Sequence, residues 1–121
     1  MKKIHYNKLI RDKIPDKIKR SGAAALYRIL NKKEFEKKLI CKAEEEASGM
    51  QAAKTKAELI SEIADVLDVI DEVKKVKKIA TSQIKKAQQK NNQKKGGFKK
   101  RIYLNWTTDS GYRTNEKTYR K

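Results

Sequence analysis

The feature of this sequence that most restricts its fold is one apolar stripe between residues 59 and 73. Its members follow one another at intervals of 4, 3, 4 and 3 residues, and they are Leu59, Ile63, Val66, Ile70 and Val73. This period is that of one face of an α-helix. Thr55 and Glu58 form a capping-box pattern just before the stripe. We therefore predict a helix from Lys56 to about Lys78, with its apolar face available for packing.

A second long helix is predicted immediately before this one. Asn31 and Glu34 repeat the capping-box pattern. A helix from there to about Ala53 places four apolar residues on one face, namely Phe35, Leu39, Ala43 and Ala47. Because only a short turn near Thr55 separates the two helices, we expect them to pack as an antiparallel pair.

Two shorter helices are predicted outside this pair. Residues 14–20 form the first, with Pro15 in its opening turn and Gly22 as its stop signal. Residues 82–93 form the other, which is mostly polar and ends at Gly96-Gly97.

The remaining segments allow at most a minor β element. Residues 24–30 are short, apolar and bounded by turn signals, so they form either a small strand or a linker. Residues 99–106 contain apolar side chains, and we expect this segment to extend and pack against the helices. The predicted fold class is therefore all-α, with a small extended element near the N- or C-terminus.

The composition predicts one domain with a thin core. The chain has 121 residues, of which 37% are apolar and 39% are charged. The apolar share is below the average for globular proteins and the charged share is well above it. We therefore expect much of the stability to come from association into a homo-oligomer.

Several classes of protein and site are excluded or disfavoured. No apolar run approaches the roughly 20 residues of a membrane span, and the lysine-rich start lacks the apolar region of a signal peptide. We therefore expect no membrane partner and a cytoplasmic location. Cys41 and His5 are the single cysteine and the single histidine, so an intramolecular disulfide and a structural zinc site are excluded. Catalysis by a Ser–His or Cys–His pair is unsupported.

The charges are arranged in three blocks. The formal net charge of +17 favours polyanionic ligands in general. Residues 1–38 contain 13 Lys/Arg and four acids, and residues 73–121 contain 16 Lys/Arg and two acids. Between them, residues 42–72 carry nine acids against three lysines. An acidic centre with basic arms suits a site that holds divalent cations together with an anionic ligand.

The acidic centre predicts a cluster of carboxylates between the two long helices. Glu58, Glu62, Asp65 and Glu72 share one face of the later helix, and the earlier helix offers three consecutive glutamates at positions 44–46. Such a set of carboxylate oxygens suits a hard cation, and magnesium bridged to phosphate is the usual case. The alternative is a solvated acidic face, and Glu58 already has a role as a capping residue.

Three blocks resemble the MazG-like, phosphoribosyl-ATP pyrophosphohydrolase-like family of all-α nucleotide pyrophosphohydrolases. The first is the run from Tyr6 to Pro15, YNKLIRDKIP. The second pairs Glu45-Glu46 with the run from Glu62 to Asp68, EIADVLD, which looks like the family's EExxE and ExxD metal motif. The third is the run from Gly96 to Ile102, GGFKKRI. The resemblance implies a MazG-like helical bundle over residues 1–106, followed by a basic polar tail over residues 107–121.

The resemblance also implies a reaction and a set of roles. The reaction is magnesium-dependent hydrolysis of a nucleoside triphosphate, or a related phosphoribosyl nucleotide, to a monophosphate and pyrophosphate, with a possible house-cleaning role. Mn²⁺ is a possible substitute for Mg²⁺. Glu46, Glu62 and Asp65 are the implied metal ligands, and Glu45 is the implied catalytic residue that orients the attacking water. The implied phosphate-binding residues are Lys8, Arg11, Lys13 and Lys95.

One departure from the motif keeps two alternatives open. Gly49 stands where EExxE has its final Glu, so one ligand of the family's set is missing. The first alternative is therefore a catalytically impaired protein that binds polyanions, including nucleic acid nonspecifically. The second is a small helical oligomer with a solvated acidic face. Four aromatic residues are candidates for base stacking, although we expect core packing for each: Tyr6, Phe98, Tyr103 and Trp106.

Overall fold

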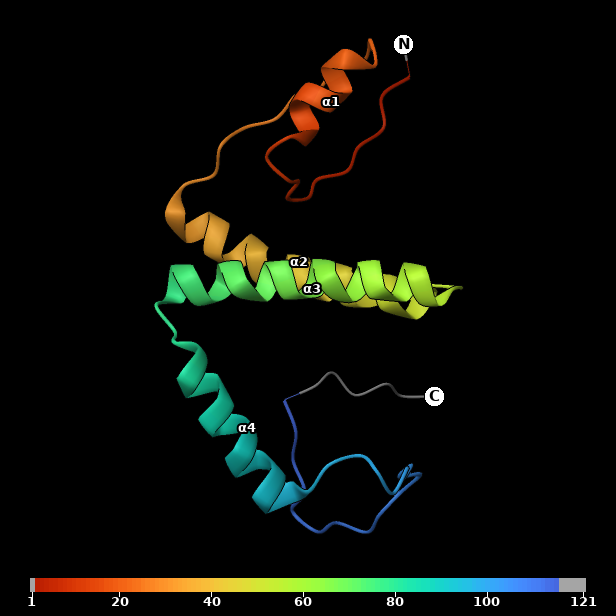
Figure 1. The fold of residues 1–121 in the computed structure, drawn as a ribbon, viewed down its shortest axis with the longest axis vertical. Coiled ribbons are helices and arrows are strands. Elements are labelled where there is room, and N and C mark those ends of the chain that lie inside the picture. Colours follow the sequence, from red (N-terminus) through yellow and green to blue (C-terminus); the bar gives the residue numbers. More distant parts are fainter. Residues whose placement is uncertain (1, 116–121) are drawn as a thin grey trace. The chain divides into compact units, whose positions relative to one another are not determined.

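The structure, a computed structural model, describes residues 2–115. It contains four helices, which are α1 (Ile14–Arg20), α2 (Lys32–Ala52), α3 (Lys56–Lys77) and α4 (Thr81–Lys95) (Figure 1). The described residues contain no β-strand, which confirms the predicted all-α class. The chain divides into two compact units, Met1–Lys85 and Lys86–Lys121, and each is described by itself below.

The helix boundaries follow from local capping chemistry. The side chain of Asn31 accepts a hydrogen bond from the backbone N–H of Glu34 at 2.9 Å. Thr55 Oγ1 accepts one from the backbone N–H of Glu58 at 3.1 Å. Each bond satisfies a donor that the first turn of a helix leaves unpaired. As a result α2 and α3 begin at the residues that the two capping-box patterns predict.

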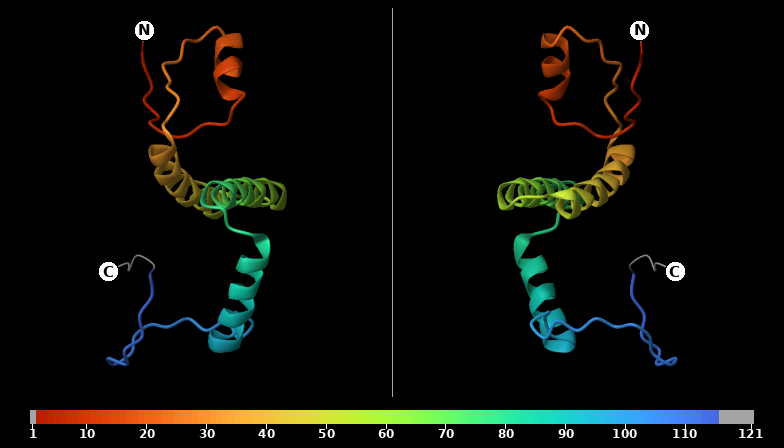
Figure 2. Two further views of the ribbon diagram at one scale, coloured as in Figure 1. Left: turned by 90° about the vertical axis from the view of Figure 1, so that its left-hand side faces the viewer. Right: turned by 90° about the vertical axis from the view of Figure 1, so that its right-hand side faces the viewer.

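Helices α2 and α3 form an antiparallel pair, which we call the hairpin. The two helices lie side by side along most of their length (Figures 1 and 2). Leu39 on α2 is the one buried side chain in the described part of the chain, with 5% of its surface exposed. An ion pair between Lys77 Nζ and Glu36 Oε2, at 3.1 Å, joins the end of α3 to the start of α2.

The face of α3 that packs on α2 is not centred on the predicted apolar stripe. It is rotated around the helix axis, so that it includes only part of the stripe. Among the half-buried residues of α3, one line along the helix consists of Glu62, Val66, Val69, Val73 and Val76, and the half-buried Asp65 and Glu72 lie beside it. Only Val66 and Val73 belong to both this line and the stripe. Leu59, Ile63 and Ile70 remain 38%, 39% and 39% exposed. The hairpin therefore half-buries one flank of α3 and leaves a second apolar flank only partly covered in the monomer.

Residues 24–30 form a linker, so the alternative of a strand is wrong. Leu26 and Ile29 are almost fully exposed in it. Arg28 ties the linker to the first turn of α2, because its guanidinium donates to both carboxylate oxygens of Glu34 at 3.0 and 2.6 Å. The hydrogen bond from Arg28 lowers the pKa of Glu34. The contact therefore stabilises the fold at pH values above the ordinary glutamate pKa, and this stabilisation is lost as the pH falls through the lowered pKa of the folded state.

The second unit contains most of α4 and the segment that follows it. The helix ends at Gly96, whose φ of +77° favours glycine. We expected residues 99–106 to pack against the helices, but Ile102, Tyr103 and Trp106 are largely exposed. The physical reason is that the only apolar side chains of α4 are Ile84 and Ala87, which leave no apolar face to pack on.

The predicted polar tail is only partly covered by the structure. Residues 107–115 adopt neither helix nor strand, and residues 116–121 lie outside the described part of the chain. Among the described helices, none combines the length and the hydropathy that crossing a membrane would require.

Candidate functional site

Three carboxylates from the two helices of the hairpin converge on one point. Oxygen atoms of Glu46 on α2 and of Glu62 and Asp65 on α3 all lie within 4.8 Å of one another, and we call these residues the carboxylate cluster. Glu62 and Asp65 share a flank of α3 because residues three apart are neighbours on a helix surface. The antiparallel register brings Glu46 opposite to them. All three side chains are half-buried, which leaves them partly accessible to a ligand.

Gly49 gives the Glu62 carboxylate its space. A Cβ built at position 49 would overlap Oε2 of Glu62 and would lie 2.8 Å from its Cδ. Position 49, where the motif of the resembled family has a glutamate, therefore carries no side chain here, and the Glu62 carboxylate of α3 fills the space. The same gap explains why a glycine in the middle of α2 is compatible with the hairpin.

Replacing Gly49 with Ala is expected to change stability and metal affinity in opposite directions. The helix gains about 1 kcal/mol because alanine has the higher helix propensity. The new methyl group displaces the flexible end of Glu62 from the cluster, so Mn²⁺ affinity falls. Thermal unfolding and Mn²⁺ titration measure the two effects. Ser48→Ala is the matched control, since Ser48 is exposed on α2 and bonds only to the carbonyl oxygen of Glu45. Unchanged Mn²⁺ affinity in Gly49→Ala would contradict the account.

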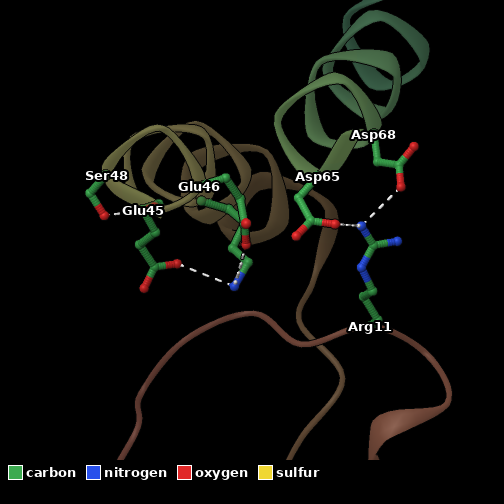
Figure 3. A network of polar contacts seen from close by, with 7 residues as sticks. Arg11, Glu45, Glu46, Ser48, Asp65 and Asp68 are labelled. Atoms are coloured by element: carbon green, nitrogen blue, oxygen red, sulfur yellow. Dashed lines mark hydrogen bonds and ion pairs between the residues drawn. The ribbon is translucent and has the colours of Figure 1, made fainter. Parts of the chain in front are cut away.

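Arg11 closes one side of the cluster. Its Nη2 donates to Asp65 Oδ1 at 2.8 Å and to Asp68 Oδ2 at 2.9 Å, and Figure 3 shows the guanidinium between the two carboxylates. The hydrogen bond to Asp68 is the main cause that raises the pKa of Arg11, so the group stays fully charged. Asp65 therefore already has a cationic partner, supplied by the segment before α1.

Arg11 is expected to compete with a metal ion for Asp65. Replacing Arg11 with Gln should raise Mn²⁺ affinity about fivefold, since an exposed ion pair is worth up to about 1 kcal/mol. Isothermal titration with Mn²⁺ measures the change. The control is Arg28→Gln, which removes an equal charge from a pair with Glu34 outside the cluster. Equal changes in Mn²⁺ affinity in both variants would show an effect of net charge alone, and they would contradict a competition between Arg11 and the metal for Asp65.

Glu45 does not join the carboxylate cluster. Successive residues of an α-helix point about 100° apart, so Glu45 and Glu46 cannot share a direction. Lys42 lies between them, with its Nζ 3.5 Å from Glu45 Oε2 and 3.4 Å from Glu46 Oε1. In Figure 3 the side chain of Glu45 points away from Asp65. It lines an open surface depression together with Cys41, Glu44 and Ser48, all from α2.

The other predicted phosphate-binding cations are spread along the chain. Lys8 is exposed, with its Nζ 5.5 Å from the ring centre of Tyr6. Lys13 is exposed at the N-cap of α1. Lys95 ends α4 and belongs to the second unit, so the structure gives no distance between it and the cluster. Of the four predicted cations, the described contacts bring only Arg11 to the carboxylates.

Two contacts of the site were not predicted. Lys42 could have been found from its spacing, because a lysine four residues before Glu46 is a common helix pair. The pairing of Asp68 with Arg11 has no such signal, since 57 residues separate them. Long-range pairs of this kind depend on how the N-terminal segment crosses the hairpin.

The carboxylate cluster fits a hard divalent cation. Magnesium prefers oxygen ligands, usually one or two carboxylates together with waters and substrate phosphates. Glu62 makes no ion pair or hydrogen bond with any other described side chain. It therefore offers an uncompensated charge between two carboxylates that already have cationic partners.

Comparisons with family models, with curated proteins and with solved structures found no match for this chain. The resemblance to the MazG-like family therefore stays a prediction from the three sequence blocks, and the function must be argued from the site.

Proposed function

We propose that this protein hydrolyses a nucleoside triphosphate, or a related phosphoribosyl nucleotide, to a monophosphate and pyrophosphate with the aid of Mg²⁺. The observation that carries the proposal is the convergence of Glu46, Glu62 and Asp65 between two facing helices. The three residues are also the implied ligands of the ExxD and EExxE pattern. The resemblance to the family motif and the distances in space therefore point to the same side chains.

The three carboxylates would hold the cation, and Arg11 would serve the substrate. A bound Mg²⁺ would polarise the phosphoryl oxygens and lower the pKa of a coordinated water. A cation at Asp65 would weaken the pairing of that carboxylate with Arg11, while Asp68 would still hold the guanidinium at 2.9 Å. The other N–H donors of Arg11 could then pair with phosphate oxygens, for which its planar fork is well suited. Glu45 has no part in this proposal, because its carboxylate pairs with Lys42 outside the cluster.

The experiment is a survey of nucleotides with the purified chain. Canonical and modified nucleoside triphosphates are incubated with Mg²⁺, and pyrophosphate and monophosphate are quantified separately. The expected result is equal release of the two products, abolished by a chelator and restored by Mn²⁺. Release of inorganic phosphate alone, or no turnover of any nucleotide, would reject the proposal.

We also propose that the chain forms a homo-oligomer through the partly covered apolar flank of the hairpin. Leu59, Ile63 and Ile70 lie on the flank of α3 opposite to Asp65 and Asp68, so their burial leaves the carboxylate cluster accessible. Light scattering at micromolar concentration should give a dimer or a larger assembly, and Ile63→Asp should shift it toward the monomer. A wild-type monomer would contradict this proposal without affecting the proposed reaction.

A further inference from the structure

The second unit carries strong positive charge with few internal partners. Residues 86–115 contain eight Lys/Arg and a single acid, Asp109. Asp109 pairs with Arg113 at 3.9 Å, and among the described residues this is the only ion pair that involves a basic residue of that range. The remaining cations extend from Lys86 on α4 to Arg101, and all of them are exposed. Positive charge without internal compensation is available to a polyanion.

The same unit displays its aromatic rings instead of burying them. Phe98 is 97% exposed and Trp106 is 79% exposed, while Tyr103 and Tyr112 are also largely exposed. The backbone explains the placement of Phe98. A turn closed by the hydrogen bond from Arg101 N–H to the Phe98 carbonyl, at 3.1 Å, follows directly after the end of α4. Beyond this turn the described chain forms no helix or strand that covers these rings.

The combination distinguishes between kinds of polyanion. A duplex hides the faces of its bases, so it would use the positive charges but not the rings. An anionic membrane would favour a helix with a broad apolar face, whereas α4 has only Ile84 and Ala87 as apolar residues. A single strand presents phosphates and unstacked bases together, and proteins bind it with a basic surface and aromatic platforms.

We propose that residues 86–115 bind single-stranded nucleic acid, with Phe98, Tyr103 and Trp106 stacking on bases and the neighbouring lysines pairing with phosphates. This binding requires no metal and makes no use of the carboxylate cluster. It therefore goes beyond the proposed reaction and is independent of it. The residues next to Phe98 supply the charges, since Lys99, Lys100 and Arg101 follow it directly.

The test uses the full chain and labelled oligonucleotides of about 12 nucleotides, a length within the usual range for one such site. Fluorescence anisotropy is measured for single-stranded RNA, single-stranded DNA and a duplex of equal length, all in the presence of a chelator. Trp106 is the only tryptophan, so its intrinsic fluorescence reports stacking at one position. The expected result is quenching of Trp106 and at least about tenfold tighter binding of a single strand than of the duplex.

Variants separate stacking from charge. Replacing Phe98 and Trp106 with Ala should weaken single-strand binding at least about tenfold and leave the salt dependence unchanged. Replacing Lys99 and Lys100 with Gln should reduce the slope of log affinity against log salt by about 1.4. Tyr27→Ala, at an exposed aromatic residue outside this unit, is the matched control and should bind like the wild type.

Three outcomes would overturn the proposal. The first is equal affinity for the duplex or for heparin, which would indicate nonspecific electrostatics. The second is unchanged binding in the Phe98 and Trp106 variant. The third is tighter association with vesicles containing phosphatidylserine than with any oligonucleotide, which would identify a membrane surface as the partner. Loss of nucleotide hydrolysis in the carboxylate variants has no bearing on any of the three, because a chelator is present throughout.

Discussion

Replacing Glu62 with Gln and Asp65 with Asn in one variant should lower magnesium-dependent pyrophosphate release at least about 100-fold. Substitution of residues that merely orient metal ligands typically costs 10- to 100-fold in affinity or activity, so the loss of two ligands should cost more. Both substitutions preserve the shape of the side chain and remove its charge. Glu46 would then remain as the only anionic member of the cluster, and it is already paired with Lys42 at 3.4 Å.

A matched control lies on the same helix. Asp71 and Glu72 are the same two residue types on α3, and each pairs only with a lysine three residues further on. The variant Asp71→Asn, Glu72→Gln therefore makes the same change in net charge outside the cluster, and it should keep its activity. Mn²⁺ titration gives a second readout that does not depend on turnover. Equal losses in both variants would mean that net charge, and not the cluster, controls the reaction.

The helix boundaries could be predicted because they depend on neighbouring residues. Asn31 and Thr55 each cap a helix through a backbone N–H three residues ahead, so a window of four residues contains the whole interaction. The pairing of α2 with α3 followed from the short connection between them. The common flank of Glu62 and Asp65 follows from their spacing in the same way, whereas the choice of Glu46 among the three glutamates at positions 44–46 came only from the resemblance to the family motif.

The contacts that were not predicted depend on how a helix or segment is placed against the rest of the fold. On α3 the line containing Val69 and Val76 has the same 4 and 3 spacing as the predicted stripe, so periodicity cannot tell which line faces α2. The site of Arg11 depends on the path of the N-terminal segment over the hairpin. The exposure of Phe98 depends on the absence of an apolar face on α4.

Leu39, the one buried side chain among the described residues, packs between the two helices that carry the carboxylate cluster, so its loss should affect both the stability of the hairpin and metal binding. Leu39→Ala should lower the free energy of unfolding by about 2–3 kcal/mol, near the lower end for buried leucines because the surrounding residues are only half-buried. Ile40→Ala, at a residue 54% exposed on the same helix, is the control, and both variants are compared at a protein concentration low enough for the chain to be a monomer, because Ile40 lies in the proposed oligomer contact. Chemical unfolding followed by circular dichroism measures both variants, and equal costs would show that Leu39 is not the centre of the α2–α3 contact.

The same pair of variants separates the hairpin from the oligomer. Glu46 lies on the face of α2 that contains Leu39, so loosening the contact in Leu39→Ala separates Glu46 from Glu62 and Asp65. Mn²⁺ affinity should therefore fall in Leu39→Ala at temperatures where the wild type is still folded. Ile40 is 54% exposed and lies about 100° around α2 from Leu39. We therefore assign it to the proposed oligomer contact, and its replacement should promote dissociation of the oligomer with little change in Mn²⁺ affinity. If Ile40→Ala also lowers Mn²⁺ affinity, the carboxylate cluster depends on subunit association, and the hairpin alone does not assemble the site.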